Sequence, residues 1–398
     1  MVRRYEVVSA DAHILEPPRL WEKWLPKKHR DKAPKLVKDE EGGDAWLFGG
    51  TGQPDPIGLV STPGRAWKDL KWTGVTYDEI RPGCFDGAER LKDMDEDGVD
   101  AEILFAPQRT IGHFLGDEDD EFVKAGVEAY NDFLREEFCA PDRSRLIGLA
   151  QIGSLGTERS VKELEAAARR GFKGVVISSW PSAKDAISRE DDPFWAAAQD
   201  ADTTVTNHIT MVSRKARIAQ RKAAIQAGQS ATSGAGHSQS RDLKAKAVGG
   251  LGSVFTVVPP NMAQLIMTGV FDRFPKLRFV FVETGAGWIP HFLEQMDDRF
   301  WRNRAWAELE LRHAPSHYWY RNMAATFIVD RTAILLRHAC GVDNILWSAD
   351  YPHHGNDWPY SQKTIAEMMF DVDPEERRRI VGRNAVRWFR LEEPETGR

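Results

Sequence analysis

The chain has 398 residues, of which 41% are hydrophobic and 29% charged, a composition typical of a globular protein long enough to bury a large core. Its formal charge of −6, from 54 basic and 60 acidic side chains, argues against nucleic acid as a partner, because phosphate binding needs a net basic face. The sequence contains neither an apolar run of the roughly 18 residues that span a bilayer nor an apolar signal segment in its first residues, MVRRYEVVSADAH. We therefore expect a cytoplasmic protein that binds neither nucleic acid nor membrane.

Short apolar runs rich in β-branched residues alternate with amphipathic stretches along the chain, a pattern typical of β-α units. Eight such runs predict strands at residues 5–10, 101–105, 146–152, 174–178, 203–207, 277–282, 323–328 and 344–348. The clearest helices between them are predicted at residues 157–170 and 288–301. Eight strands alternating with helices predict an α/β fold, a (β/α)8 TIM barrel that forms one domain over residues 1–398.

Two segments interrupt this alternation. Residues 45–60, AWLFGGTGQPDPIGLV, predict a β-hairpin inserted after the first strand, within an insertion of about residues 36–80. Residues 214–252 begin with a basic, helical run and continue through the Gly/Ser-rich stretch SATSGAGHSQS. This second insertion follows the fifth strand, so in a barrel it would lie on the catalytic face as a lid, an oligomer contact or a disordered loop. Its basic run is compatible with a subunit contact, a gate for an anionic substrate or a solvated helix.

Active sites in barrels of this kind lie at the carboxyl ends of the strands. Four of the eight predicted strands are followed by residue types that bind metals, namely Asp11 with His13, His208, Glu283 and Asp350. One such residue at a strand end is more often a helix cap or a turn residue. Four strand ends with the same chemistry predict a metal site.

Four further residues extend the candidate site. His353, His354 and Glu16 are close in sequence to the primary candidates, and we interpret His353 as catalytic and the other two as additional metal ligands. A solvated loop position is the alternative for His354, and capping of the following helix is the alternative for Glu16. His291, after Pro290, is a candidate proton shuttle.

Three residues are candidates for binding a substrate. Arg109, just past the second strand, is suited to bind a carboxylate with both arms of its guanidinium, although a surface ion pair is the alternative. Trp180 follows the fourth strand and Trp288 follows Glu283, so either ring is a candidate wall of an apolar pocket.

The blocks SADAHILEPPRLWEKWLP, FPKLRFVFVETGAGWIPHFLEQMD and SADYPHHGNDWP resemble the amidohydrolase superfamily, in its amidohydrolase-related branch that includes aminocarboxymuconate semialdehyde decarboxylase. Further similarity in PGCFDGAERLKDMDEDGVDAEILF and GFKGVVISS extends the resemblance over nearly the whole chain, except residues 214–252. The resemblance implies a TIM barrel of the metal-dependent hydrolase type and a small-molecule substrate. It also implies a homodimer or pairing with a related subunit.

The resemblance carries the family's His-x-His motif onto Asp11-Ala12-His13, and its later ligands onto His208, Glu283 and Asp350. Asp11 and Glu283 stand where many members have histidine, and no lysine at the end of the fourth strand fits a carbamylated bridging ligand. Three carboxylates with two imidazoles suit Mn²⁺ or Fe²⁺ at least as well as Zn²⁺. We expect one divalent metal ion, and the excess of negative charge leaves room for a second.

The leading hypothesis is a metal-dependent hydrolase or non-oxidative decarboxylase that acts on a small carboxylate or carbonyl substrate. Asp350 would ligate the metal and either serve as general base toward a bound water or orient the substrate. A non-haem dinuclear iron, or manganese/iron, monooxygenase that hydroxylates a carbon centre is the alternative on the same fold. A non-catalytic partner subunit is the third hypothesis, and the complete set of ionisable strand-end residues argues against it.

Overall fold

The computed structural model describes residues 5–209, 211–229 and 241–391. Its central parallel strands are β1 (Val8–His13), β5 (Ala101–Phe105), β6 (Leu146–Gly148), β7 (Ala150–Gln151), β8 (Gly174–Val176), β9 (Thr204–His208), β10 (Phe279–Val282), β11 (Met323–Phe327) and β12 (Ile345–Trp347). They pair in the orders β1-β5-β6 and β7-β8-β9-β10-β11-β12. Only Leu149, whose amide donates to the Leu104 carbonyl (3.1 Å), separates β6 from β7, so these two are halves of one strand.

The first and last of these strands lie beside each other, although they are more than 300 residues apart in sequence. The Asp350 amide donates to the Asp11 carbonyl (3.0 Å), and the His13 amide donates to the Tyr351 carbonyl (2.6 Å). Chain order around the sheet and contact between its two edges are the arrangement of a (β/α)8 barrel. The predicted α/β class, with parallel strands, is confirmed.

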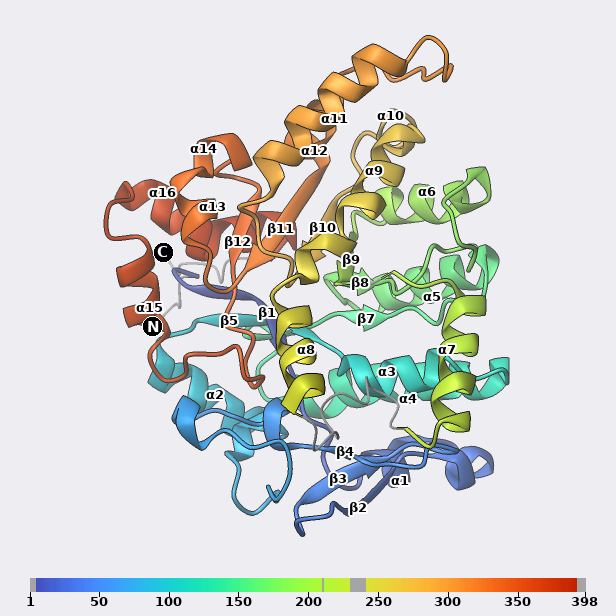
Figure 1. Ribbon diagram of the computed structural model, residues 1–398, viewed down its shortest axis with the longest axis vertical. Coiled ribbons are helices and arrows are strands. Elements are labelled where there is room, and N and C mark those ends of the chain that lie inside the picture. The colour runs from blue at the N-terminus through green and yellow to red at the C-terminus, as the bar shows by residue number, and fades with distance from the viewer. Residues whose placement is uncertain (1–4, 210, 230–240, 392–398) are drawn as a thin grey trace.

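Helices surround the strands (Figure 1). They are α1 (Leu20–Trp24), α2 (Gly87–Asp97), α3 (Gln108–Leu115), α4 (Asp120–Phe133), α5 (Thr157–Arg169), α6 (Asp192–Asp200), α7 (Arg214–Gln226), α8 (Arg241–Leu251), α9 (Pro259–Met267), α10 (Val270–Arg273), α11 (Ile289–Asn303), α12 (Pro315–Asn322), α13 (Arg331–Leu335), α14 (Arg337–Cys340), α15 (Ser361–Met368), α16 (Pro374–Arg378) and α17 (Asn384–Trp388). Local residues fix both ends of helix α2. The Asp86 side chain caps its N-terminus by accepting from the Glu89 amide (2.9 Å), and Gly98, with φ of +72°, ends the helix. Among the described residues, no helix is long and apolar enough to cross a membrane.

The strands are buried because alternate residues face two apolar layers. Val8 and Ala10 of β1, and Val280 and Val282 of β10, belong to a cluster that also contains Trp388 of α17. The intervening residues of the strands pack against the surrounding helices in the larger cluster. This period of two follows from the pleat of a strand, and it accounts for the continuous apolar runs in the sequence.

Two predicted strands extend further than their apolar runs. The first was predicted at residues 5–10, but β1 runs to His13, because its pairing with β5 continues to His13 opposite Phe105 across an irregular register after Ser9. Likewise β9 includes His208, which lies opposite Val282 of β10. These candidate metal ligands are therefore the last residues of strands, where the ladder fixes their direction.

The inserted hairpin predicted at residues 45–60 is part of a larger structure. A three-stranded antiparallel sheet is formed by β2 (Lys35–Lys38), β3 (Asp44–Leu47) and β4 (Asp55–Pro56), and it starts ten residues earlier than predicted. The prediction missed β2 because its KLVK sequence has lysines at both ends and little apolar character. The Asp39 side chain fixes the turn after β2 by accepting from the Gly43 and Gly74 amides (2.8 Å each).

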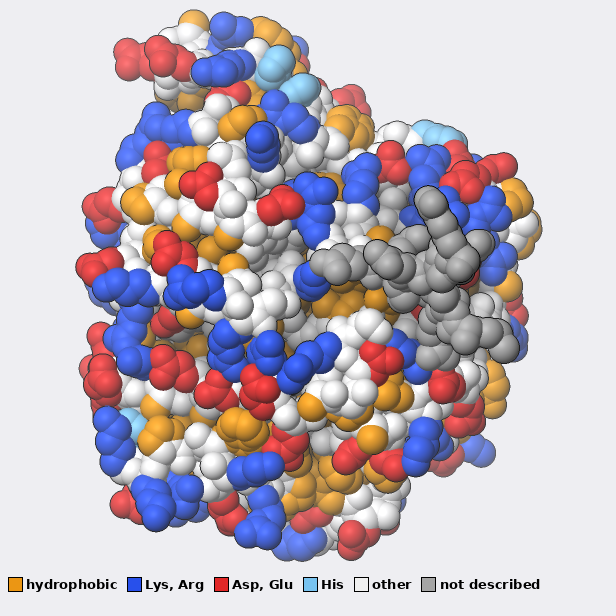
Figure 2. Space-filling model, turned by 180° about the vertical axis from the view of Figure 1, so that it is seen from behind, with side chains coloured by type: hydrophobic (Ala, Val, Ile, Leu, Met, Phe, Trp, Pro, Cys, Tyr) orange, Lys and Arg blue, Asp and Glu red, His pale blue; other side chains and the backbone are white. Residues whose placement is uncertain are grey.

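The insertion after β9 begins with α7, so the predicted basic helix is confirmed. Its Gly/Ser-rich stretch at residues 230–240 lies outside the described residues. A second helix, α8, was not predicted. Figure 1 shows α7 running beside α3 toward the inserted sheet, and Figure 2 shows acidic and basic side chains interspersed over the opposite face, as the near-balanced charge leads us to expect.

Candidate metal centre and its adjoining cavity

The predicted metal ligands converge at the carboxyl ends of the parallel strands. Asp11 and His13 come from β1 and His208 from β9, while Glu283 and Asp350 follow β10 and β12 directly. One donor atom from each of Asp11, His13, His208 and Glu283 lies within 4.8 Å of the others. A second group, formed by His13, Asp350 and His353, meets the same criterion and shares His13 with the first.

The distances place the two imidazoles at the middle of this cluster. His13 Nε2 lies 2.9 Å from His208 Nε2, 3.4 Å from Asp11 Oδ1 and 3.6 Å from Asp350 Oδ1. His208 Nε2 lies 3.6 Å from Asp11 Oδ1 and 3.4 Å from Glu283 Oε2. Two ring nitrogens that face each other amid three carboxylates direct their donor atoms at a common region, as ligands of one cation do.

The residues present fit a divalent cation. Asp11 is fully buried, and neither of its carboxylate oxygens, nor Oδ1 of Asp350, has a partner with hydrogen-bond geometry within the described part of the chain. Burying such anionic oxygens costs several kcal/mol each unless a cation balances them. Mixed carboxylate and imidazole ligation suits Mn²⁺, Fe²⁺ or Zn²⁺.

The pKa shifts of the clustered side chains also indicate a cation site. Burial opposes a charge on His208, but the carboxylates of Asp11, Glu283 and Asp350 outweigh it and raise its pKa to about 9. Burial, together with the neighbouring Asp350, raises the pKa of Glu283 to about 8. Burial and the Asp11 carboxylate raise the pKa of Asp350 well above its ordinary value. The cluster thus carries more negative charge than its own imidazoles balance, which is the condition that a bound cation relieves.

The backbone turns abruptly where these ligands leave their strands. Glu283 and Asp350 have φ of +59° and +52°, and Ile209, which follows His208, has φ of +56°. Non-glycine residues rarely adopt this left-handed region, and such strain concentrates at functional sites. The Glu283 amide is held by Thr326 Oγ1 of β11 (2.8 Å), so neighbouring strands hold the turns in place.

His353 connects the cluster to a cavity. Its Nδ1 lies 3.0 Å from Asp350 Oδ1, and its ring stacks on His13 with centroids 4.1 Å apart. Burial lowers the pKa of His353 to about 4, although Glu283 and Asp11 favour its charged form. The ring is therefore neutral near pH 7, with one nitrogen at Asp350 and one edge toward the cavity.

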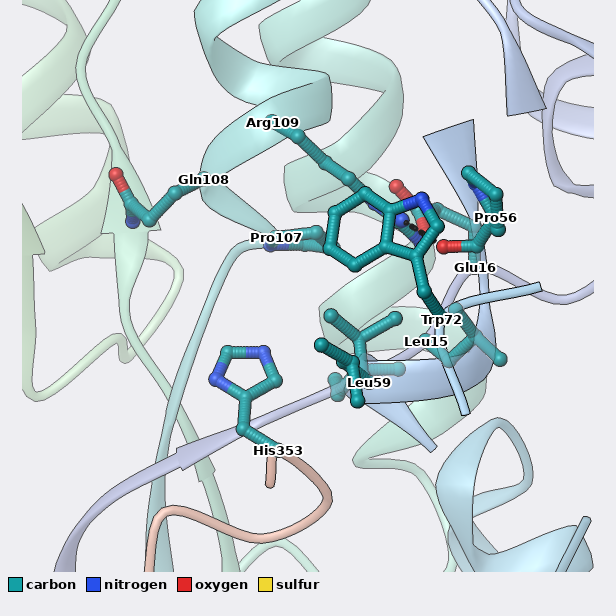
Figure 3. A pocket seen from close by; sticks show the side chains of 11 residues that line it. Leu15, Glu16, Pro56, Leu59, Trp72, Pro107, Gln108, Arg109 and His353 are labelled. Atoms are coloured by element: carbon teal, nitrogen blue, oxygen red, sulfur yellow. Dashed lines mark hydrogen bonds between the residues drawn. The ribbon is translucent and has the colours of Figure 1, made fainter. Parts of the chain in front are cut away.

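The cavity has a volume of about 190 Å³ and mainly apolar walls. It is lined by Ile14, Leu15, Glu16, Pro56, Leu59, Val60, Trp72, Pro107, Gln108, Arg109 and His353. In Figure 3, His353 lies on one side, while Trp72, Arg109, Glu16 and Pro56 gather on the other. The first insertion supplies four of these residues between Pro56 and Trp72, so it walls the cavity.

Glu16 and Arg109 are the charged residues of this wall. Glu16 is fully buried, its Oε1 accepts from Thr110 Oγ1, and its Oε2 has no hydrogen-bond partner among the described residues. Arg109 Nη1 donates to the Pro56 carbonyl (2.9 Å), while its buried Nη2 is without such a partner there. Arg109 and Glu16, predicted as substrate and metal residues respectively, both face the cavity, and Glu16 belongs to neither group of donor atoms.

Four other candidates lie elsewhere among the described residues. His291 is exposed on α11, and exposed His354 contributes its backbone amide to the Leu59 carbonyl (3.0 Å). Trp180 is buried but does not line the cavity. Trp288 packs against Phe292 and donates from Nε1 to the Thr284 carbonyl (3.0 Å). None of the four is brought into the donor groups or the described cavity.

Arg90 of α2 braces the centre and was not predicted from the sequence. Its Nη2 donates to the His13 carbonyl (2.7 Å), its Nη1 pairs with Glu102 (2.6 Å), and its guanidinium lies 4.0 Å from the centre of the Tyr351 ring. It therefore touches the segments that carry His13 and Asp350. The sequence did contain a sign of this role: Arg90 precedes the buried Met94 by four residues, which puts a cation on the apolar face of helix α2.

Comparison with known proteins agrees with this geometry. Residues 11–391 match the family described as amidohydrolase. Decarboxylase orsB of Emericella nidulans is 25% identical over 335 residues, which cover 81% of this chain and 87% of that protein. Among solved structures, an amidohydrolase from Mycobacterium avium subsp. paratuberculosis is similar with a TM-score of 0.69 and 20% identity, over 97% of this chain and 99% of that one.

A further similar structure is the 5-carboxyvanillate decarboxylase LigW2 of Novosphingobium aromaticivorans, solved with bound manganese and 3-methoxy-4-hydroxy-5-nitrobenzoic acid. Its TM-score is 0.63 at 18% identity, over 97% of each chain. At these identities the two structural likenesses establish a shared fold.

Proposed function

This chain belongs to the amidohydrolase family, and from that premise we propose that it is a metal-dependent, non-oxidative decarboxylase of small carboxylic acids. One observation carries the proposal: five donor side chains from the strand ends converge next to an apolar cavity of about 190 Å³, and His353, whose Nδ1 lies 3.0 Å from Asp350 Oδ1, lines that cavity. A small acid with an apolar, ring-sized body fits a cavity of this volume and lining.

Asp11, His13, His208, Glu283 and Asp350 would hold the metal ion, and we propose Mn²⁺ first because three of the five are carboxylates. The bound manganese of the similar LigW2 structure supports this choice. When bound, such an ion supplies Lewis-acid polarisation of a substrate oxygen.

Decarboxylation breaks the bond between a carbon and its carboxylate, and that carbon must then take up a proton. Asp350 and His353 are the pair that would hold this proton, because Asp350 Oδ1 and His353 Nδ1 are 3.0 Å apart and the imidazole also lines the cavity. On the opposite wall, Arg109 would orient the substrate through the Nη2 that no described residue engages.

Decarboxylation is preferred over hydrolysis because the curated relative, similar over 87% of its length, is a decarboxylase. Hydrolysis would use the same Asp350 as a base toward water. The dinuclear oxygenase would require a second ion, for which the group of His13, Asp350 and His353 is the candidate.

The test measures metal content per chain and product release together. The Mn²⁺-loaded protein is offered a panel of hydroxylated benzoic acids and short unsaturated acids, and released CO2 is detected by mass spectrometry. We expect about one metal ion per chain and CO2 from at least one acid, with Asp350→Asn inactive. Cleavage of amides or lactones without CO2 would indicate a hydrolase. Two iron ions per chain with O2 consumption would indicate the oxygenase.

We also propose that the chain is cytoplasmic, forms one domain and assembles as a homodimer. Hydrogen bonds between β1 and the segment after β12, the Asp350 amide to the Asp11 carbonyl and the His13 amide to the Tyr351 carbonyl, support the single domain. Trp301 on α11 and Tyr320 on α12 are large aromatic residues with exposed fractions of 57% and 45%, and they support an interface at these two helices. Light scattering after size-exclusion chromatography tests the dimer, which a monomer mass would overturn.

A further inference from the structure

The inserted helix α7 is held in place by ion pairs. Arg214 pairs with Asp120, Arg221 with Asp117 (3.3 Å) and Lys222 with Glu118 (2.7 Å). All three carboxylates belong to the acidic segment at the end of α3 and the start of α4. Arg221 also donates to the Gly49 carbonyl (2.9 Å), so α7 is anchored to the first insertion as well.

Arg217 belongs to the same face of α7 but has no carboxylate partner. The spacing of Arg214, Arg217 and Arg221 puts the three on one side of the helix. Within the described residues, no carboxylate oxygen lies within the 4.0 Å of an ion pair with Arg217, and residues 227–240 contain no Asp or Glu. Burial lowers the pKa of Arg217 to about 10. This guanidinium is a partly buried cation that no carboxylate balances within residues 5–209, 211–229 and 241–391.

The position of Arg217 relates it to the metal centre. Its Nη2 donates to the Ser178 carbonyl (3.0 Å). Val176 of β8 pairs with Thr206 of β9, so Ser178, two residues further, is level with the ligand His208. Arg217 therefore lies at the carboxyl end of β8, and β8 pairs with β9, the strand that supplies His208.

On its other side, Arg217 faces the helix that walls the cavity. A Cβ built on Gly112 of α3 would lie 3.8 Å from Arg217 Nη1, and Gln108, one helical turn earlier, lines the cavity. Figure 1 shows α7 alongside α3. The guanidinium thus lies between the β8 and β9 ends and the α3 wall of the site.

We propose that Arg217 binds a carboxylate of the substrate, so that the insertion supplies the charge that selects anionic ligands. This inference rests on the proposed function and extends it to a specificity residue. A guanidinium that lies at the strand ends and has no carboxylate partner among the described residues can form charge-assisted hydrogen bonds to a carboxylate, and desolvation strengthens them. Three other cations of α7, Arg214, Arg221 and Lys222, already pair with carboxylates that dock the helix.

A purely structural role for Arg217 would be to tie α7 to Ser178. Arg217→Gln separates the two roles, because the glutamine amide keeps a donor for the Ser178 carbonyl and removes the positive charge. Arg217→Lys keeps the charge without the planar fork. Lys222→Gln is the matched control, since it removes a cation of the same helix whose partner is Glu118.

The experiment is a calorimetric titration of the Mn²⁺-loaded full chain with benzoate and with neutral benzamide. Wild type is expected to bind benzoate more tightly, and Arg217→Gln to lose about tenfold in benzoate affinity with benzamide binding unchanged. Arg217→Lys should recover part of the loss, and Lys222→Gln should bind both probes as wild type does. Thermal unfolding verifies that all variants remain folded.

Equal benzoate affinity in wild type and Arg217→Gln would overturn the inference, as would a loss of the same size for benzamide or an absence of benzoate binding in wild type. These outcomes are distinguishable from failure of the proposed function. If no acid releases CO2 but Arg217→Gln still loses benzoate selectivity, the decarboxylase proposal fails and the anion site stands.

Discussion

The strand ends and the two insertions meet at the same end of the barrel but are held there by different forces. His13, Asp11 and Asp350 are buried and fixed by main-chain hydrogen bonds between β1 and the segment after β12. The second insertion is fixed mainly by side-chain ion pairs of partly exposed residues, such as Lys222 with Glu118. The comparison teaches that the donor set follows from the topology of the parallel strands, whereas the position of the second insertion depends on side-chain pairs near the surface.

Removing one donor from the strand ends should produce the largest effect. We expect His208→Ala to lose bound metal and more than about 1000-fold in turnover, because even outer-shell partners of metal ligands are worth 10- to 100-fold. Added Mn²⁺ should raise the unfolding temperature of wild type but not of this variant. Elemental analysis and thermal unfolding measure both, and His291→Ala, exposed on α11, is the control. Full metal content in His208→Ala would show that the cluster is not the binding site.

Removing the brace beneath the strand ends should reduce stability strongly. Arg90→Met leaves Glu102 buried without its partner and is expected to lower the free energy of unfolding by about 3–5 kcal/mol. Arg90→Met combined with Glu102→Leu should recover part of that loss. On the insertion, Lys222→Met removes an exposed pair and should cost less than about 1 kcal/mol. Urea titration measures all three, and equal losses in the two single variants would break the comparison.

The contact between the first insertion and α3 should be sensitive to acid. His113 packs against Phe48, Phe114 and Phe122, and burial, followed by the Arg221 charge, lowers its pKa from 6.5 to about 3. The unfolded chain therefore binds a proton below pH 6.5 that the folded chain does not, so this contribution is complete above pH 6.5 and is lost progressively toward pH 3. Between pH 7 and 5 it amounts to about 2 kcal/mol.

Urea titrations of metal-free wild type and His113→Gln at the two pH values test this expectation. Wild type should lose more stability than the variant, because His13 and His353 titrate in both proteins. The same loss in both would show that His113 is not protonated only on unfolding.

Opening the cavity wall should have the smallest effect. Trp72→Ala removes a large apolar surface of the first insertion that lines the cavity, so we expect KM to rise about tenfold with kcat nearly unchanged. Steady-state kinetics on any acid that releases CO2 measure KM and kcat separately. A fall in kcat of the same size would mean that the insertion helps to form the reaction centre, which would erase the distinction between the two regions.

The sequence by itself determined the strands and the donor types. Buried parallel strands are apolar on both faces, so their runs are visible locally, and the ionisable residues that end them, Asp11, His208 and Asp350, stand out against those runs. It also predicted that α7 is a basic helix. These features depend on periodicity and composition over a few residues, which folding preserves.

Tertiary structure alone decided where side chains far apart in sequence meet. The backbone of Glu283 and Asp350 is left-handed, and residues of neighbouring strands hold both amides by hydrogen bonds. No local sequence pattern encodes this conformation. Trp288 and Arg109 were equal candidates for binding a substrate, yet only Arg109 lines the described cavity. That Arg217 lacks a carboxylate partner among the described residues became visible only once the partners of Arg214, Arg221 and Lys222 were known. Burial and charge balance are properties of the packed chain, because each depends on segments that folding brings together.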